Sequence, residues 1–157
     1  MKNNLSIREM SSSDLSAAKL IIEDNKMFPS ELLNEMSTPF LSQTSEEKWF
    51  VVDSCDKQVI AIAYCSPERM TAGTWNLLLI AVLPSHQGHG VGRLLIEHIE
   101  SALVQKQARI MLVETSGLPE YERTRKFYPQ CGYTPVAVIP EYYGQGDDKI
   151  VFWKSLM

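Results

Sequence analysis

The sequence predicts an α/β fold in which helices flank a mixed central sheet of about seven strands. Segments with strand-like and helix-like patterns of apolar residues alternate along the chain, as they do where helices pack on a sheet. The central strand, Asn76–Val82, is followed directly by a glycine-rich loop and an amphipathic helix. A length of 157 residues is that of one domain of common size, so residues 1–157 are expected to form a single domain.

One strand and two helices are predicted in the N-terminal part. Leu5–Met10 alternates between apolar and polar residues like a half-buried strand. Ser11–Asp14 supplies N-cap residues for a helix that runs to about Lys26. Pro29 suits the first turn of a second helix, which is expected to end near Pro39.

Three strands are predicted in the middle of the chain. Trp49–Val52 and Val59–Cys65 are expected to pair through a hairpin around Asp53–Lys57. In Asn76–Val82 every residue after the first is apolar, which favours a strand covered on both faces, although a run this short does not exclude a helix. Pro84 ends this segment.

The loop Gln87–Arg93 carries three glycines and leads into a helix. The helix is predicted from apolar residues at helical spacing, namely Val91, Leu94, Leu95, Ile99, Ala102 and Leu103. Glycines before a helix form an anion site, because free backbone N–H groups point outward and missing side chains let a phosphate approach. A phosphorylated ligand is therefore expected at this loop.

The C-terminal third is predicted to hold a strand, a helix and two further strands, in the order Ala108–Glu114, Glu120–Cys131, Thr134–Ile139 and Lys149–Lys154. Pro129 is expected to kink this helix or to lie in its last turn, because proline lacks an N–H group and clashes with the preceding turn. Gly132 then acts as the C-terminal stop.

The spacing of the glycines distinguishes between phosphate-binding motifs. A P-loop requires Lys and then Ser or Thr after its glycines, and no such pair follows here. A dinucleotide motif counted from Gly88 would need its third glycine at Arg93, and one counted from Gly90 would need it at Leu95. Both of these interpretations are excluded.

The pattern that fits is Gln-x-x-Gly-x-Gly, at Gln87, Gly90 and Gly92. Preceded by Ile80-Ala-Val-x-Pro84, it resembles the acetyl-CoA-binding motif of the GCN5-related N-acetyltransferases, the GNAT family. The order of predicted elements, βααβββαβαββ, is also that of the acetyltransferase fold.

A second segment resembles the same family's C-terminal motif, Asn-x-x-Ala-x-x-x-Tyr-x-x-x-Gly-Phe. Tyr128, Gly132 and the final aromatic Tyr133 match this motif in register. Tyr121 and Thr124 stand where Asn and Ala are usual, so the contact with CoA made by that Asn is not carried over. The two motifs occur in the family's order, about forty residues apart.

The resemblance implies that acetyl-CoA is a co-substrate whose acetyl group passes to a primary amine by direct attack. The implied coenzyme-binding residues are Ile80, Ala81, Val82, Gln87, Gly88, His89, Gly90, Val91, Gly92 and Arg93. Backbone N–H groups of the loop are expected to hold the pyrophosphate, and the edge of Ile80–Val82 to pair with the pantetheine amides like an added strand.

Tyr128 matches the general acid of the family, which helps the CoA thiolate to leave. Neighbouring residues on a helix face different directions, so Phe127 is expected to face the core and Tyr128 to face elsewhere. The alternative is that Tyr128 only packs beside Phe127.

The acceptor of the amine proton is not fixed by a motif. Many members of the family carry an acid on the central strand, whereas Asn76 cannot accept a proton. Glu114 ends the next strand, at the sheet edge where open α/β sheets bind ligands, and it is the first candidate base. A solvated Glu or a helix cap is the alternative for Glu114, and Glu68 is the second candidate.

Pro140–Asp148 is polar, aromatic and glycine-bearing, as a lid or recognition loop would be, or as an ordinary hairpin connection would be. Its acids, Glu141, Asp147 and Asp148, would attract a cationic amine. A polyamine, an aminoglycoside, an amino acid and a protein Lys or N-terminus all fit these features, so the acceptor is a small-molecule or peptide amine.

Composition excludes other classes of protein. A net charge of −4 and a pI near 5.4 argue against nucleic acid as the main partner. No apolar run reaches the ~18 residues of a membrane span and no signal peptide is recognised, so a cytoplasmic protein, monomeric or homodimeric, is expected. The three cysteines are expected to act as small hydrophobes, and His86 and His89 make no metal site.

Three functional hypotheses follow. The first is an acetyl-CoA-dependent N-acetyltransferase, an acyltransferase. The second is a non-catalytic acyl-CoA-binding regulatory module on the same fold, which thiol release with any amine would exclude. The third is a different nucleotide-binding enzyme, which ATP or NAD would stabilise where CoA does not.

Overall fold

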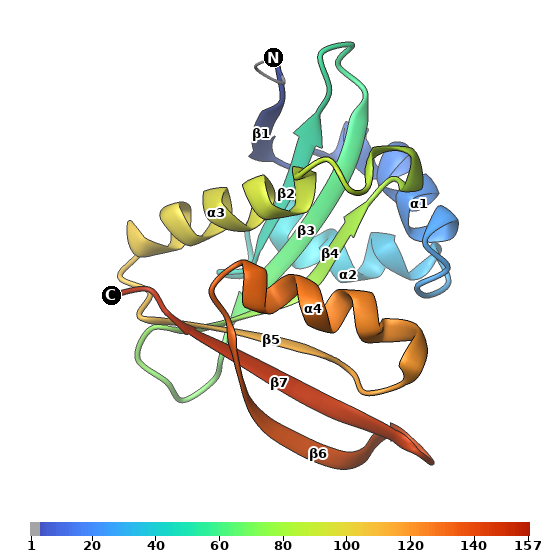
Figure 1. Ribbon diagram of the computed structural model, residues 1–157. Helices are drawn as coiled ribbons and strands as arrows, with labels where there is room; N and C mark the ends of the chain where they lie inside the picture. The colour runs from blue at the N-terminus through green and yellow to red at the C-terminus, as the bar shows by residue number, and fades with distance from the viewer. Residues whose placement is uncertain (1–3) are drawn as a thin grey trace. The chain divides into compact units, whose positions relative to one another are not determined.

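The computed structural model describes residues 4–157 (Figure 1). Its strands and longer helices are, in chain order, β1 Ser6–Glu9, α1 Leu15–Asp24, α2 Leu32–Leu41, β2 Lys48–Asp53, β3 Val59–Pro67, β4 Thr74–Val82, α3 Val91–Val104, β5 Ile110–Ser116, α4 Glu122–Gln130, β6 Thr134–Gly144 and β7 Asp147–Ser155. Within the described residues the strands form one mixed seven-stranded sheet, in the order β1-β2-β3-β4-β5-β7-β6. The predicted fold class is therefore confirmed.

The contacts within the described chain divide it into two compact units. The first consists of the chain up to Ser66 together with Leu79–Ile99, and the second of Pro67–Leu78 with Glu100–Met157. The strand β4 and the helix α3 thus each contribute residues to both units.

In the first unit the strands β1, β2 and β3 pair antiparallel. The 3-10 turn Ser12–Asp14, which leads into α1, is capped by Ser11, whose backbone N–H donates to the Asp14 carboxylate at 2.8 Å. The core consists of buried apolar side chains from α1, α2 and the strands: Met10, Ala18, Ile21, Ile22, Leu33, Trp49, Val51, Val59, Ile62, Leu79 and Ala81. Ala18, Ile21 and Ile22 lie on one face of α1, because three or four residues complete a helical turn.

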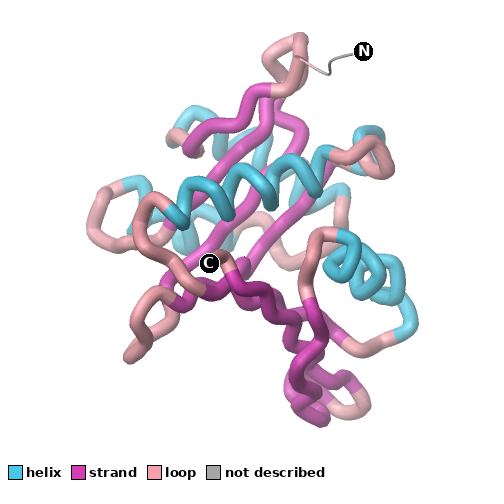
Figure 2. The backbone as a smooth tube through the Cα atoms, turned by 60° about the vertical axis from the view of Figure 1, so that its left-hand side comes forward, coloured by secondary structure: helices cyan, strands magenta, loops and turns pink. Residues whose placement is uncertain are grey.

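In the second unit β4 and β5 run parallel, and β5 pairs antiparallel with β7. The strands β6 and β7 form a long hairpin, which Figure 2 draws as two adjacent magenta strands. The helix α4 ends as predicted, with Pro129 in its last turn. Gly132 follows with a φ of 92°, in the left-handed region that glycine adopts most readily.

The predicted start of the second helix and the predicted end of the strand at Ile139 are both wrong. The helix α2 begins at Leu32 rather than Pro29, because Pro29 and Ser30 form a turn whose carbonyls accept from Leu32 and Leu33. Pro39 lies inside α2, in its last turns, where its missing N–H removes only one bond near the helix end.

The strand expected to end at Ile139 also continues, to Gly144, so Pro140–Asp148 is mostly hairpin and not a loop. The register shifts between Ile139 and Gly144, and Glu141 there has a φ of 55°, as in a β-bulge. Tyr142 and Tyr143 belong to a residue type that favours strands.

No helix within the described residues is long and apolar enough to cross a membrane.

Candidate active site

The glycine loop lies in the first unit, between β4 and α3. Gly88 and Gly90 have φ values of 78° and 82°, which side chains other than glycine rarely adopt. The Leu94 N–H donates to Gly90 O at 3.1 Å, so the helical bonding starts at Gly90. The N–H groups of the first turn, from Val91 onward, then have no acceptor inside the helix. Such a turn suits an anion.

The loop is held in place by two side-chain amides. Gln87 Nε2 donates to Asn25 Oδ1 at 2.9 Å and to Val82 O at 3.0 Å. Asn25 Nδ2 donates in turn to Val82 O at 3.0 Å and to Ile21 O at 2.9 Å. The Gln87 side chain therefore fixes the loop to the ends of β4 and α1. Asn25 was not predicted, because its place at the end of α1 signals only a helix terminus.

Of the remaining loop residues predicted to bind a coenzyme, Gly88, His89, Gly90 and Arg93 are exposed, Gly92 is half-buried and Val91 is buried. The Gln87 N–H is already engaged by Pro84 O at 3.3 Å. Arg93 pairs with Glu97 one turn along α3, at 3.2 Å, with both side chains largely exposed. A Cβ at Gly90 would meet nothing within 4 Å, and His89 is exposed. The loop thus offers backbone donors from Gly88 onward to a ligand from outside.

The strand β4 adds a second feature. It pairs with β5 from Thr74 to Leu77, and Leu78–Val82 continue beyond this register. In this second half Leu79 and Ala81 are buried in the core, whereas Leu78 is half exposed. The expectation of a strand covered on both faces thus fails at Leu78. An extended ligand would find backbone donors and acceptors along this segment.

The second unit holds a cluster of polar side chains around Asn76. Asn76 Nδ2 donates to Glu68 Oε1 at 2.9 Å and to Glu114 Oε1 at 2.7 Å. Asn76 is 2% exposed, and its Oδ1 accepts no hydrogen bond from the described residues. The structure therefore brings together the two candidate bases, Glu114 and Glu68, and Asn76, which cannot accept a proton. One buried amide bridges the two carboxylates.

Lys149 of β7 completes this cluster. Its Nζ forms an ion pair with Glu114 Oε2 and lies 3.9 Å from the centre of the Tyr142 ring. Burial disfavours the Lys149 ammonium, but the hydrogen bond to Glu114 raises the pKa of Lys149 overall, so it stays charged at neutral pH. Burial, with the nearby Glu114 charge, raises the pKa of Tyr143. No local sequence pattern indicates a role for Lys149, because its partner Glu114 lies on another strand, far away along the chain.

Tyr128 is buried in the second unit, against Tyr133 and Phe152, at ring-centre distances of 6.1 and 5.4 Å. The expected orientation of the pair is reversed, because Tyr128 faces the core and Phe127 is only partly buried. Burial raises the pKa of Tyr128 well above its usual range, so the phenol keeps its proton at neutral pH. A raised pKa makes this phenol a weaker acid than an exposed Tyr, so the burial favours a packing role, and the donor role stays a prediction.

Other predicted features have simpler surroundings. Burial raises the pKa of the Cys65 thiol to about 12, so it stays protonated, and Cys131 is also buried. Among residues 4–157 no group of three or more His, Cys, Asp or Glu side chains could hold a metal ion.

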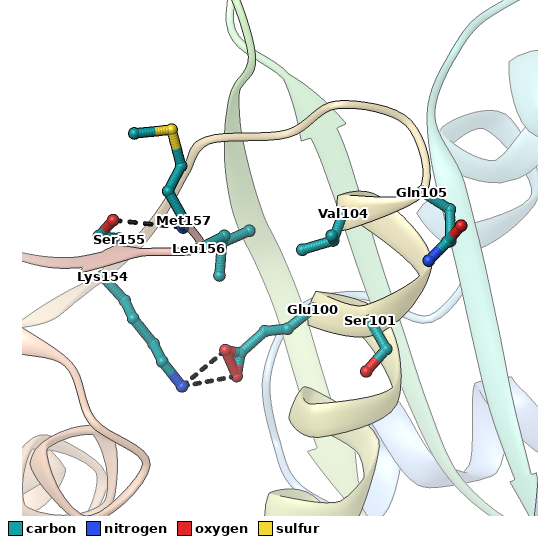
Figure 3. Close-up of a pocket in the computed structure, with 8 residues that line it drawn as sticks. All are labelled: Glu100, Ser101, Val104, Gln105, Lys154, Ser155, Leu156 and Met157. Atoms are coloured by element: carbon teal, nitrogen blue, oxygen red, sulfur yellow. Dashed lines mark hydrogen bonds and ion pairs between the residues drawn. The ribbon is translucent and has the colours of Figure 1, made fainter.

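In the second unit a pocket of about 350 Å³, lined by none of the predicted site residues, lies between the end of α3 and the C-terminal residues. There Lys154 and Glu100 point toward each other at 2.7 Å (Figure 3). Lys154 and Glu100 therefore neutralise each other's charge. The other residues that line the pocket carry no charged side chain.

The model of the acetyltransferase (GNAT) domain matches residues 45–135. A search of curated proteins finds no match. A protein from Desulfovibrio desulfuricans assigned to the GNAT family of acetyltransferases has a similar structure, with 26% identity, a TM-score of 0.89, and coverage of 98% of this chain and 99% of that chain.

Two further structures are similar in fold. The ribosomal-protein-S18-alanine N-acetyltransferase from Escherichia coli has 22% identity and a TM-score of 0.75, over 97% of this chain and 94% of that chain. A Salmonella typhimurium protein assigned acetyltransferase activity, solved with acetyl-CoA, has 17% identity and a TM-score of 0.77, over 99% of this chain and 95% of that chain.

Proposed function

Because the chain belongs to the GNAT family of acetyltransferases, we propose that it transfers the acetyl group of acetyl-CoA to a primary amine of a small molecule or protein. The observation that carries the proposal is the glycine loop at the start of α3, which lies inside the matched residues 45–135. Acetyl-CoA is the co-substrate. The reaction is a direct attack of the amine on the thioester, without a covalent enzyme intermediate.

The coenzyme would be held chiefly by backbone groups. Donors from Gly88 to Arg93 suit the pyrophosphate, because free N–H groups and the helix dipole both favour negative charge. The backbone of Ile80–Val82, beyond the ladder with β5, suits the pantetheine amides. The Gln87 side chain contributes by fixing the loop and leaves the contact with phosphate to its neighbours.

The chemistry requires a proton acceptor and a proton donor. Alkylamines are largely protonated at neutral pH, because their pKa values resemble the ~10.4 of Lys. The carboxylate cluster around Asn76, which contains both Glu114 and Glu68, would take that proton. Tyr128, which matches the general acid in the family's C-terminal motif, would donate a proton to the CoA thiolate.

The acceptor amine would be drawn by negative charge. Glu141, Asp147 and Asp148 lie at the β6–β7 hairpin, and Tyr142 and Tyr143 there are exposed aromatic rings. Carboxylates beside aromatic faces attract an ammonium group by charge and by cation–π contact. We also propose that the protein is cytoplasmic and acts as a monomer or homodimer.

The experiment is a thiol-release assay with acetyl-CoA over a panel of amines. The panel contains spermidine, an aminoglycoside, free amino acids, and peptides with an N-terminal amine or a Lys. We expect CoA to appear only when protein and a productive amine are both present, with a mass gain of one acetyl group on that amine.

Calorimetry with CoA separates the alternatives. Tight CoA binding without thiol release for any amine would support the regulatory module, and stabilisation by ATP or NAD in place of CoA would support another nucleotide-binding enzyme.

A further inference from the structure

This inference rests on the proposed acetyl transfer and concerns which carboxylate accepts the amine proton. The two carboxylates that share Asn76 Nδ2 differ in what else they contact. Both oxygens of Glu114 are engaged, Oε1 by Asn76 and Oε2 by the Lys149 ammonium. A substrate ammonium that approached Glu114 would meet the like charge of Lys149, which its surroundings keep protonated.

Glu68 has one engaged oxygen and one open oxygen. Its Oε1 accepts from Asn76, and no described residue donates to Oε2. The side chain is half buried, so a proton taken from a substrate can pass on to solvent. Glu68 thus offers an oxygen that neither a cation nor an amide occupies.

The backbone of Glu68 is fixed by a short turn between β3 and β4. The Glu68 N–H donates to Thr74 O, and Thr71 Oγ1 donates to Glu68 O, both at 2.8 Å. The turn is tied to the start of β5, because the Arg109 N–H donates to Gly73 O at 2.7 Å. A Cβ at Gly73 would lie 2.8 Å from Gln107 O, so only glycine fits there. A residue held this firmly is suited to positioning a substrate.

We propose that Glu68 is the catalytic base, and that Asn76, Glu114 and Lys149 position it. Glu68 takes a proton from the substrate ammonium, which leaves a neutral amine and a protonated Glu68. The amine nitrogen attacks the thioester carbonyl carbon, the C–S bond breaks, and its electron pair leaves on sulfur. The Tyr128 phenol proton passes to the CoA thiolate. The nitrogen loses its second proton, which restores the Tyr128 phenol through solvent and leaves a neutral amide. Glu68 releases its proton to solvent.

Asn76 serves this arrangement better than an acid would. Each Nδ2 hydrogen is used by one carboxylate, so a single amide holds both at hydrogen-bond distance. An Asp at this position would place a third carboxylate against two others without a donor between them. The absent acid on the central strand is therefore a requirement of the cluster, with the proton acceptor displaced to Glu68.

The charged and titratable groups that surround Glu68 and its partners come from several elements. They are Glu114 on β5, Lys149 and Asp147 on β7, and Tyr142 and Tyr143 on β6. Of these, Lys149 pairs with Glu114 and so offsets one of the two carboxylates that share Asn76. The pH profiles of variants at Glu68 and at Glu114 must therefore be compared with each other.

The test compares Glu68→Gln with Glu114→Gln and with Glu120→Gln, an exposed carboxylate on the turn before α4 that serves as a matched control. We expect Glu68→Gln to lower kcat/KM by about 10²-fold or more and to remove the enzyme's acidic limb. Glu114→Gln is expected to lower kcat/KM by about tenfold and to keep that limb. The limb is assigned with amines of different pKa, because a limb that moves with the amine belongs to the substrate.

Folding and rescue are measured on the same proteins. CoA affinity and melting temperature are expected to stay close to wild type in Glu68→Gln, since Gln can still accept from Asn76. Glu68→Asp is expected to recover part of the rate together with the acidic limb. Asn76→Ala, which frees both carboxylates, is expected to shift the limb without abolishing it, as a positioning role requires.

Two results have separate meanings. If wild-type protein releases no CoA with any amine, the proposed function fails and this inference falls with it. If wild-type protein turns over but Glu68→Gln keeps both rate and limb, or if Glu114→Gln alone loses the limb, only the assignment of Glu68 is overturned.

Discussion

The glycine loop and the carboxylate cluster reach their geometry in different ways. The loop is one continuous segment, Gln87–Arg93, whose donors are backbone groups. The cluster takes single side chains from four separate parts of the chain, at Glu68, Asn76, Glu114 and Lys149. A site made of backbone depends on local conformation, whereas a site made of distant side chains depends on the pairing of strands. Changes in the loop should therefore alter coenzyme affinity, and changes in the second unit should alter the rate.

The largest effect beyond Glu68 is expected at Tyr128. Tyr128→Phe keeps the buried ring and removes only the hydroxyl, so kcat should fall by about 10²-fold with little change in CoA affinity. Steady-state kinetics from pH 6 to 9 and calorimetry measure the two effects. Tyr133→Phe, in the same aromatic cluster, is the matched control. A wild-type kcat in Tyr128→Phe would leave this residue with a packing role alone.

A smaller effect, on affinity alone, is expected at Gly90. Gly90→Asp places a negative charge and a strained φ where phosphate is proposed to bind, so Kd for CoA should rise at least about tenfold, or about 1.4 kcal/mol. Gly146→Asp is a close control, because Gly146 has a φ of 76° and equally open surroundings at the β6–β7 turn. If both folded variants bind CoA like wild type, the proposed phosphate site is wrong.

An intermediate case is Asn25, which supports the loop from α1. Asn25→Ala removes one of the two acceptors of Gln87 Nε2 and one donor to Val82 O. We expect a loss of about 1–2 kcal/mol in unfolding free energy and a threefold to tenfold weaker affinity for CoA, with kcat unchanged. Denaturant unfolding and calorimetry measure these quantities. A reduced kcat at saturating CoA would show that the loop and the chemistry are not separable.

The smallest effect is expected at Arg93. Its side chain is exposed and paired with Glu97, and exposed pairs of this kind contribute about 0–1 kcal/mol. If backbone groups dominate phosphate binding, Arg93→Ala should weaken CoA binding by about twofold to threefold. Lys106→Ala, another exposed cation, controls for the loss of net charge. A loss above tenfold in Arg93→Ala alone would make the side chain the main contact.

The sequence could predict the features that depend on neighbouring residues, as the glycine loop does, better than those that depend on distant side chains, as the carboxylate cluster does. The loop, the strand before it and the helix after it depend on nearby residues, so the motif at Gln87–Gly92 located them. The fold class followed from the alternation of strands and helices, and the stop at Gly132 from glycine's access to positive φ. The coenzyme and acid roles of these residues remain predictions, which the variants above test.

The features of the candidate site that the sequence did not predict depend on contacts between residues far apart in the chain. Sequence indicated that Phe127 and Tyr128 face different ways, but only the packing of Tyr133 and Phe152 determines that Tyr128 is the buried one. Lys149 carries no local signal, because its role arises from the β5–β7 register. From the sequence, Asn76 stands where the family usually has an acid. The structure shows that its amide donates to both Glu68 and Glu114.

The turn that carries Glu68 has a consequence for redesign of the protein. Gly73 is closed in by Gln107 and is joined through its carbonyl to Arg109, so this turn and the connection that leads into β5 are fitted to each other. An insertion or deletion in either would displace the other, and chimeras that exchange only one of them are expected to misfold locally. Libraries that seek new acceptors should therefore vary length at the exposed β6–β7 tip around Gly144 and Gly146, where added atoms meet no neighbours, and should inherit the Glu68 turn and its partner segment together from one parent.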